Sequence, residues 1–168
     1  MSQNENRMYI VFPAIPENER MARMIAAAFI TNMNPTIEEL DDVKTAVSEA
    51  VTNCVIHAYR DEKNGTQKQN IEKKLGKQND EILEQKEAGN QIEMILEQKD
   101  QIVTVVILDK GKGIENVALA MEPLYTSIPE EERSGMGFSF MEAFMNELYV
   151  ESEPGKGTKV TMKKQIGK

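Results

Sequence analysis

The chain has 168 residues, of which 29% are charged and 40% are hydrophobic, a composition typical of one globular domain. Its 20 basic and 28 acidic residues give a formal net charge of −8, which disfavours nucleic-acid binding because such proteins contact phosphates through Lys and Arg. The single cysteine, Cys54, excludes a disulfide scaffold and a cysteine-ligated zinc site and indicates a reducing compartment.

The sequence also contains no signal for a membrane or for export. No apolar run approaches the roughly 20 residues that a membrane helix needs. The first residues lack the basic segment and the long apolar core of a signal peptide. We therefore expect a cytoplasmic protein that contacts neither membranes nor nucleic acid directly.

The first part of the chain predicts a strand followed by two helices. A short β-branched and aromatic run that ends in a proline predicts a strand at residues 9–12. Apolar residues at helical spacing predict a helix over residues 17–33, which an Asn-Pro pair ends. Thr36 and Glu39 have the spacing of a capping box, which begins a second helix that we expect to reach about residue 57.

A polar segment separates these elements from the rest of the domain. Residues 63–90 are rich in Lys, Gln, Glu and Asn and have few large apolar side chains, so we expect a solvated insertion, either disordered or partly helical. Further along, the patterns predict a hairpin at 91–96 and 102–108, a helix at 138–147, and strands at 148–153 and 158–163. Because helices and strands do not alternate strictly, we predict a single α+β domain over residues 1–168. It would be a two-layer sandwich with a mixed, mostly antiparallel sheet and helices on one face.

Three polar residues form a stripe on the second predicted helix. Glu49, Asn53 and His57 lie four residues apart, which places them on one face of an α-helix. A carboxylate can act as a general base, and an amide oxygen is a ligand suited to magnesium. Such a stripe is also typical of a solvent-facing helix flank, so the pattern alone leaves both interpretations open.

Two glycine motifs mark further candidate sites. An Asp-x-Gly-x-Gly motif at residues 109–113 ends a predicted strand, where backbone can approach a ligand closely. A Gly-x-Gly motif at residues 135–137 precedes a helix, whose N-terminal amides attract anions, and Arg133 lies just upstream. Neither motif matches the Walker or dinucleotide pattern, and each alone also fits an ordinary turn or hinge.

Together, in this order along the chain, the motifs resemble the ATP-binding fold shared by type II topoisomerases, Hsp90, sensor histidine kinases and mismatch-repair ATPases. Within that superfamily, three stretches resemble the anti-sigma F factor family of sporulation regulators: "SEAVTNCVIHAY", "PLYTSIPEEERSGMGFSFMEAFMNELYVES" and "GKGTKV". The resemblance covers residues from about 9 to 164, apart from the insertion. The corresponding loop of the family is short, so the insertion is a departure that could alter dimer contacts or partner docking.

The resemblance implies a role for each matching residue. Glu49 would be the catalytic base toward the attacking hydroxyl, and Asn53 would bind the magnesium ion. Asp109 would accept a hydrogen bond from the adenine amino group, and Arg133 would act near the terminal phosphate. The remaining nucleotide-binding positions would be Gly111, Gly113, Ser134, Gly135, Met136, Gly137, Phe138 and Thr158.

The resemblance also implies a function. The chain would be an anti-sigma factor and an ATP-dependent, magnesium-dependent protein serine/threonine kinase. It would sequester a sporulation sigma factor of the sigma F type and phosphorylate a serine of an anti-anti-sigma protein, with Arg23 contacting both partners and with a homodimer as the active form. The alternative is a non-catalytic module that binds a sigma factor in a nucleotide-dependent way.

Overall fold

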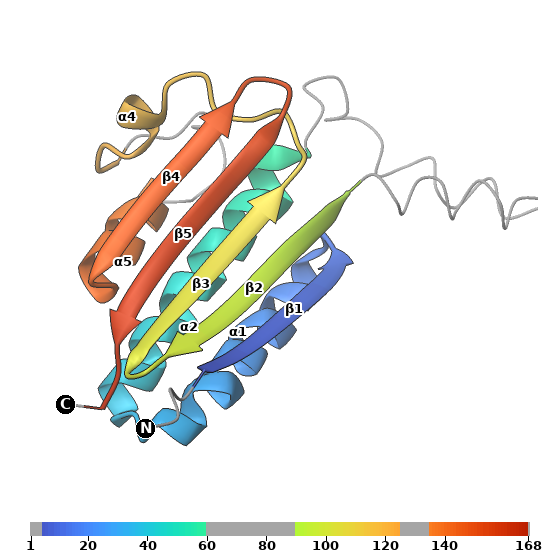
Figure 1. Cartoon of the computed structure of the whole chain (residues 1–168). Helices are drawn as coiled ribbons and strands as arrows, with labels where there is room; N and C mark the ends of the chain where they lie inside the picture. The colour runs from blue at the N-terminus through green and yellow to red at the C-terminus, as the bar shows by residue number, and fades with distance from the viewer. Residues whose placement is uncertain (1–4, 60–89, 125–134, 168) are drawn as a thin grey trace, which may run out of the picture.

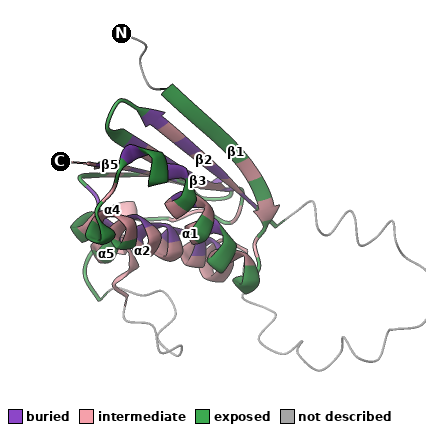
Figure 2. Ribbon diagram, turned by 90° about the horizontal axis from the view of Figure 1, so that it is seen from below, coloured by how far each residue is buried: buried purple, intermediate pink, exposed green. Residues whose placement is uncertain are grey.

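The computed structural model describes residues 5–59, 90–124 and 135–167, which form two layers (Figure 1). Five strands make one sheet in the order β1-β2-β3-β5-β4, and every pairing between these strands is antiparallel. The helices lie on one face of the sheet, as Figure 2 shows from another side. The expected α+β sandwich is therefore confirmed. We predicted a mixed, mostly antiparallel sheet, and among the described residues all strand pairs are antiparallel.

The elements largely follow the predicted order. The strands are β1 (Glu5–Pro13), β2 (Gln91–Lys99), β3 (Ile102–Asp109), β4 (Glu147–Glu153) and β5 (Gly157–Gln165). The helices are α1 (Pro16–Ile30), η1 (Thr31–Met33), α2 (Ile37–Asn53), η2 (Cys54–Ala58), α4 (Val117–Ala120) and α5 (Gly137–Phe144). Among these helices, none has the length and apolar character needed to cross a membrane.

The two helices that follow β3 differ from the prediction. The four-residue helix α4 was not expected, because so short a helix has no apolar periodicity. The helix expected to reach residue 147 ends at Phe144, since Met145 is extended and Glu147 already pairs with Lys163 of β5. The predicted insertion lies outside the described residues except for Asn90, which directly precedes β2.

The core lies between the sheet and the helices. Alternate residues of the strands point toward the helices and are fully buried, among them Ile92, Met94 and Leu96 of β2. The central helix α2, which packs against both α1 and α5, buries one apolar stripe. That stripe consists of Val43, Ala46, Val47, Ala50 and Val51. Its C-terminal end is thereby held in a fixed position over the sheet.

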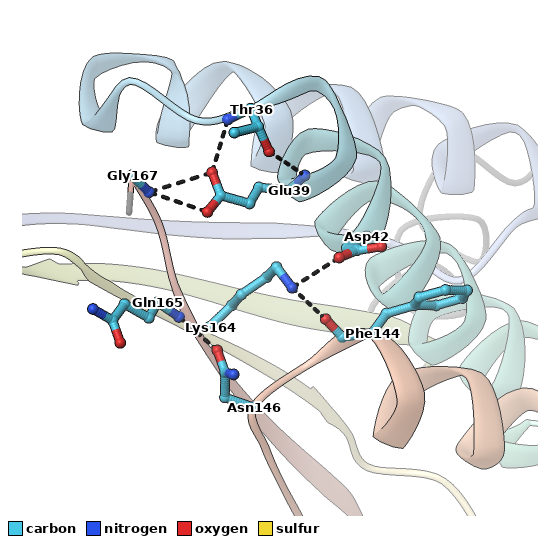
Figure 3. A network of polar contacts seen from close by, with 8 residues as sticks. All are labelled: Thr36, Glu39, Asp42, Phe144, Asn146, Lys164, Gln165 and Gly167. Carbon is cyan, nitrogen blue, oxygen red and sulfur yellow. Dashed lines mark hydrogen bonds and ion pairs between the residues drawn. The ribbon is translucent and has the colours of Figure 1, made fainter.

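The N-terminus of α2 is capped as predicted. The Thr36 hydroxyl accepts a hydrogen bond from the Glu39 amide at 3.1 Å, and a Glu39 carboxylate oxygen accepts one from the Thr36 amide at 2.7 Å. The same carboxylate accepts a hydrogen bond from the amide of Gly167, near the end of the chain (Figure 3). The capping box therefore also holds the C-terminal segment against α2.

A second set of contacts joins the end of β5 to the helices (Figure 3). The Lys164 ammonium lies 2.8 Å from a carboxylate oxygen of Asp42 and donates to the carbonyl of Phe144 at 2.7 Å. The side chains of Lys164 and Asp42 are only 11% and 19% exposed. Because the pair is largely removed from water, the loss of one partner leaves a poorly solvated charge.

Replacing Lys164 by methionine is therefore expected to lower the free energy of unfolding by about 2 kcal/mol, less than for a fully buried pair because Asp42 keeps some contact with water. The matched control is Lys44→Met, which breaks an exposed pair with Asp41 and should cost at most about 0.5 kcal/mol. Urea unfolding of both variants measures the difference. Equal losses in the two variants would contradict this interpretation.

Replacing Glu39 by alanine should destabilise the fold by about 1 kcal/mol at pH 7, by loss of the cap. The backbone amide of Thr36, followed by that of Gly167, holds the pKa of the Glu39 carboxyl below its ordinary value. A depressed pKa in the folded state contributes stability above the unfolded-state pKa, and this stability is lost as the pH falls through the folded-state pKa. The difference in the free energy of unfolding between the wild type and Glu39→Ala should therefore shrink as the pH falls. Thermal unfolding of wild type, Glu39→Ala and the exposed control Glu38→Ala between pH 7 and pH 3 tests this, and a pH-independent deficit contradicts it.

Candidate functional site

A cavity of about 730 Å³ opens between the C-terminal end of α2, the loop after β3 and the N-terminus of α5. Its volume lies within the roughly 300–1,000 Å³ that is usual for small-ligand sites. Figure 1 places the end of β3 and the end of α2 on the same side of the molecule, where α4 also lies. The residues that the sequence analysis selected and that line this cavity are Glu49, Asn53, Asp109, Gly113, Gly135, Met136, Gly137, Phe138 and Thr158.

Of the other four candidates, two lie outside this lining and two lie outside the described residues. Arg133 and Ser134 lie outside the described residues. Gly111 lies in the loop next to the cavity, where it contacts η2. Arg23 lies on α1, with its Nε 3.6 Å from a carboxylate oxygen of Glu19, and therefore belongs to a different surface from the cavity.

One end of the cavity brings α2 and α5 into close contact. A Cβ atom added to Gly137 would lie 3.2 Å from Oε2 of Glu49 and 3.3 Å from Oδ1 of Asn53, so the glycine backbone lies directly against both side chains. Gly137 begins α5, and Met136 at the N-cap position makes no side-chain capping bond. The first amides of a helix have no acceptor within the helix. A carboxylate, an amide oxygen and the positive end of a helix therefore converge here.

The helix that carries Glu49 and Asn53 changes its winding where it enters the cavity. From Cys54 to Ala58 it continues as a π-helical turn. Such turns are rare, and they are frequent at functional sites. His57 was expected on the same stripe from α-helical spacing, and it lines the cavity together with Glu49 and Asn53 despite the wider turn.

Asp109 lies at the end of β3 and is only 8% exposed. One carboxylate oxygen accepts a hydrogen bond from the Gly111 amide at 2.9 Å, and the other accepts one from the thiol of Cys54 at 3.5 Å. On the neighbouring strand it is paired with Thr158, as expected. Burial raises the pKa of Asp109 above its ordinary value, although the hydrogen bonds from Gly111 and Cys54 act against this shift. The cavity thus contains a hydrogen-bond acceptor that is largely shielded from water.

The two glycines after Asp109 are required by close backbone contacts. A Cβ atom at Gly111 would lie 2.1 Å from the carbonyl oxygen of Ala58, and one at Gly113 would lie 2.2 Å from that of Glu153. Gly113 also has a φ of 72°, which disfavours other residues. Of these two glycines, only Gly113 lines the cavity. A glycine is needed at position 111 because the loop packs closely on η2.

Tyr59 also contacts the loop that follows Asp109. Its hydroxyl accepts a hydrogen bond from the Lys110 amide at 2.9 Å and donates one to the carbonyl of Gln91 at 2.5 Å. The described chain stops after Tyr59 and resumes at Asn90, so this hydroxyl joins the two sides of the gap to the loop after Asp109.

Sequence reasoning missed several residues of this site. Cys54 continues the apolar face of α2 into η2, where a cysteine is indistinguishable from a packing residue, so no sequence signal identified its contact with Asp109. Asn116 and Leu119 line the cavity from the unpredicted helix α4. The side chain of Asn116 caps that helix by accepting from the Leu119 amide at 3.0 Å, and an asparagine at this position was the available signal.

Replacing Gly111 by alanine should lower the free energy of unfolding by about 1–3 kcal/mol, because the new methyl group would overlap the backbone of Ala58. The matched control is Gly155→Ala. A Cβ atom at Gly155 meets nothing within 4 Å, so only its φ of 78° opposes the change, at a cost of about 1 kcal/mol. Urea unfolding compares the two, and a smaller loss for Gly111→Ala than for the control would be inconsistent with the close contact.

Comparison with known proteins identifies the family. The family model described as "Histidine kinase-like ATPase domain" matches residues 12–164. The anti-sigma F factor of Clostridium beijerinckii is 47% identical over 163 residues, covering 97% of this chain and 96% of that protein. The anti-sigma F factor of Clostridium acetobutylicum is 45% identical over 162 residues, covering 96% and 95%. A solved structure of the RsbU and RsbW domains of Rv1364c from Mycobacterium tuberculosis has the same fold, with a TM-score of 0.60 at 16% identity, covering 97% of this chain and 33% of that one. The chain therefore belongs to the anti-sigma F factor family, a branch of the histidine kinase-like ATPase domains.

Proposed function

We propose that the cavity binds magnesium-ATP and that the chain is an anti-sigma factor with protein serine kinase activity. The observation that carries this proposal is the convergence of Glu49 and Asn53 on the N-terminus of α5 in a cavity that is also lined by the buried carboxylate of Asp109. Membership of the anti-sigma F factor family supports it. The substrate proposed is a serine hydroxyl on an anti-anti-sigma protein.

The cavity suits a nucleotide at both ends. Asp109, when ionised, only accepts hydrogen bonds, and an adenine amino group is a donor of matching chemistry. At the opposite end, the N-terminal amides of α5 suit phosphate oxygens. We propose that Arg133 and Ser134, which lie outside the described residues, add further contacts to the phosphates.

The residues at the phosphate end also fit a magnesium ion. Magnesium is usually bound by one or two protein oxygens together with substrate phosphates and water. The amide oxygen of Asn53 lies against the backbone of Gly137, where those phosphates would be held. When bound, the ion neutralises charge on the phosphates during transfer.

Glu49 is the residue proposed to act on the protein substrate. Its carboxylate accepts the proton of the serine hydroxyl while that oxygen forms a bond to the terminal phosphorus. The bond from this phosphorus to the bridging oxygen breaks, and ADP leaves with the electron pair. The contact between Glu49 and Gly137 supports this role, because such a transfer requires the base close to the phosphates.

The proposed partners are a sporulation sigma factor and the anti-anti-sigma protein. Relatives that share nearly the whole length of the chain are anti-sigma F factors. We propose that Arg23 contacts both partners from α1, where Met21 and Met24 are also 61% and 60% exposed. Flexible methionine side chains are frequent on protein-binding surfaces. We also propose that the active form is a homodimer.

Calorimetric titration with magnesium-ATP, followed by a phosphorylation assay on a purified anti-anti-sigma protein, tests the proposal. Asn53→Ala should lose most of the magnesium-dependent affinity. Glu49→Gln should keep binding within about twofold but lose at least about 100-fold in phosphoryl transfer, because only the proton acceptor is removed. Glu142→Gln, on the exposed side of α5, is the matched control and should leave both unchanged.

The assay also separates the proposal from the non-catalytic alternative. If the wild type binds nucleotide and a sigma factor but transfers no phosphate, the chain is a binding module. If Glu49→Gln transfers phosphate at the wild-type rate, Glu49 is not the base. If the wild type binds no nucleotide, the proposal fails as a whole.

A further inference from the structure

The only cysteine of the chain is in direct contact with the buried aspartate of the cavity. Cys54 is the first residue of η2, is 4% exposed, and places its sulfur 3.5 Å from Oδ2 of Asp109. The other oxygen, Oδ1, accepts a hydrogen bond from the Gly111 amide at 2.9 Å. The two oxygens are therefore held from different elements, one by the helix and one by the loop.

The thiol acts as the donor in this contact. The Cys54 side chain is buried, and its sulfur lies within hydrogen-bond distance of Oδ2 of Asp109. A thiol is a weak donor, and an ionised carboxylate only accepts. The hydrogen bond therefore runs from Sγ to Oδ2.

We propose that Cys54 is a positioning residue that fixes the Asp109 carboxylate as an acceptor and thereby makes the cavity select 6-aminopurine nucleotides over 6-oxopurine nucleotides. The inference rests on the proposed nucleotide site and concerns its choice of base. Cys54 and Asp109 both line the cavity, so their contact belongs to the proposed site.

The physical argument concerns the orientation of one carboxylate. With donors on both oxygens, the group cannot turn without losing a hydrogen bond, and each oxygen retains a further acceptor direction. An amino group at position 6 of the base can donate to this fixed acceptor. A carbonyl at the same position presents lone pairs to a carboxylate and is repelled. Removal of the thiol takes away one of the donors that hold the carboxylate and leaves the backbone hydrogen bonds from Gly111 and Thr158. The penalty against the carbonyl should therefore fall along with the affinity for the amino group.

The direct test uses the infrared S–H stretching band, because the chain contains one thiol. In the nucleotide-free wild type, the band should lie at lower frequency than in a control peptide with a solvated cysteine, as expected for donation to a carboxylate. Asp109→Asn replaces the ionised acceptor by a neutral one and should move the band to higher frequency. This measurement requires no nucleotide.

The functional test compares the dissociation constants of magnesium-ATP and magnesium-ITP by calorimetry. Cys54→Ala should raise the dissociation constant of magnesium-ATP by about three- to tenfold, as expected for the loss of one modest hydrogen bond. The dissociation constant of magnesium-ITP should rise by less, so the ratio of the two constants moves toward one. Cys54→Ser supplies a hydroxyl donor and should restore both. Val51→Ala, a truncation of a fully buried side chain in the neighbouring helix α2, controls for lost packing and should leave the ratio unchanged.

Each outcome decides the inference. An unshifted S–H band in the wild type, or an unchanged ATP-to-ITP ratio in Cys54→Ala, overturns it. So does a ratio that Val51→Ala changes equally, because packing alone would then account for the effect. If the wild type binds neither nucleotide, the proposed function fails and base selection fails with it, while the S–H band still reports whether the thiol donates to Asp109. If Cys54→Ala does not fold, the serine variant and the S–H band decide.

Discussion

The close approach of backbone to the end of α2 is the constraint on which the site depends. Gly137 begins α5 directly against Glu49 and Asn53, and Gly111 lies directly against the carbonyl of Ala58. A Cβ atom at Gly111 would overlap the backbone of η2, and one at Gly137 would press against the ends of the Glu49 and Asn53 side chains. The glycines therefore set the distance between the groups that are proposed to act together, and their effect is steric rather than chemical. Protein interiors are packed closely enough that shifts of this size are not absorbed locally.

The charges around the cavity favour a nucleotide that is accompanied by a metal ion. Both Glu49 and Asp109 are acidic, and the whole chain has a net charge of −8, so a bare nucleotide polyphosphate would be repelled. Lys112 is the lysine in the described lining. The N-terminus of α5 supplies roughly half an elementary charge, which is too little to balance a triphosphate. Magnesium held by Asn53 and the phosphates, with Arg133 from outside the described residues, would supply the remaining positive charge.

The sequence predicted those features that depend on local patterns. The α+β class, the start of α2 at its capping box and the hairpin of β2 and β3 follow from spacing, because the interactions responsible join residues close in the chain. The selected cavity residues came from motifs with a recognisable order. The features that were missed either depend on a long-range contact or are too short to show a period. Cys54 meets Asp109 across 55 positions, and the π-helical turn and α4 leave no periodic pattern that could be recognised.

The two ends of α2 make different contacts, because the length of the helix separates them. Its N-terminal end is held by Thr36, Glu39 and Asp42, which contact the C-terminal segment of the chain. Its C-terminal end carries Glu49 and Asn53 into the cavity. A helix of 17 residues is roughly 25 Å long, so the anchor and the cavity share no side-chain contacts. Substitutions at the anchor can therefore change stability at a distance from the cavity, whereas Asp109 and the close contacts of Gly111 and Gly137 lie at the opposite end of the helix. The fold thus separates the contacts of the C-terminal segment from the residues that line the cavity.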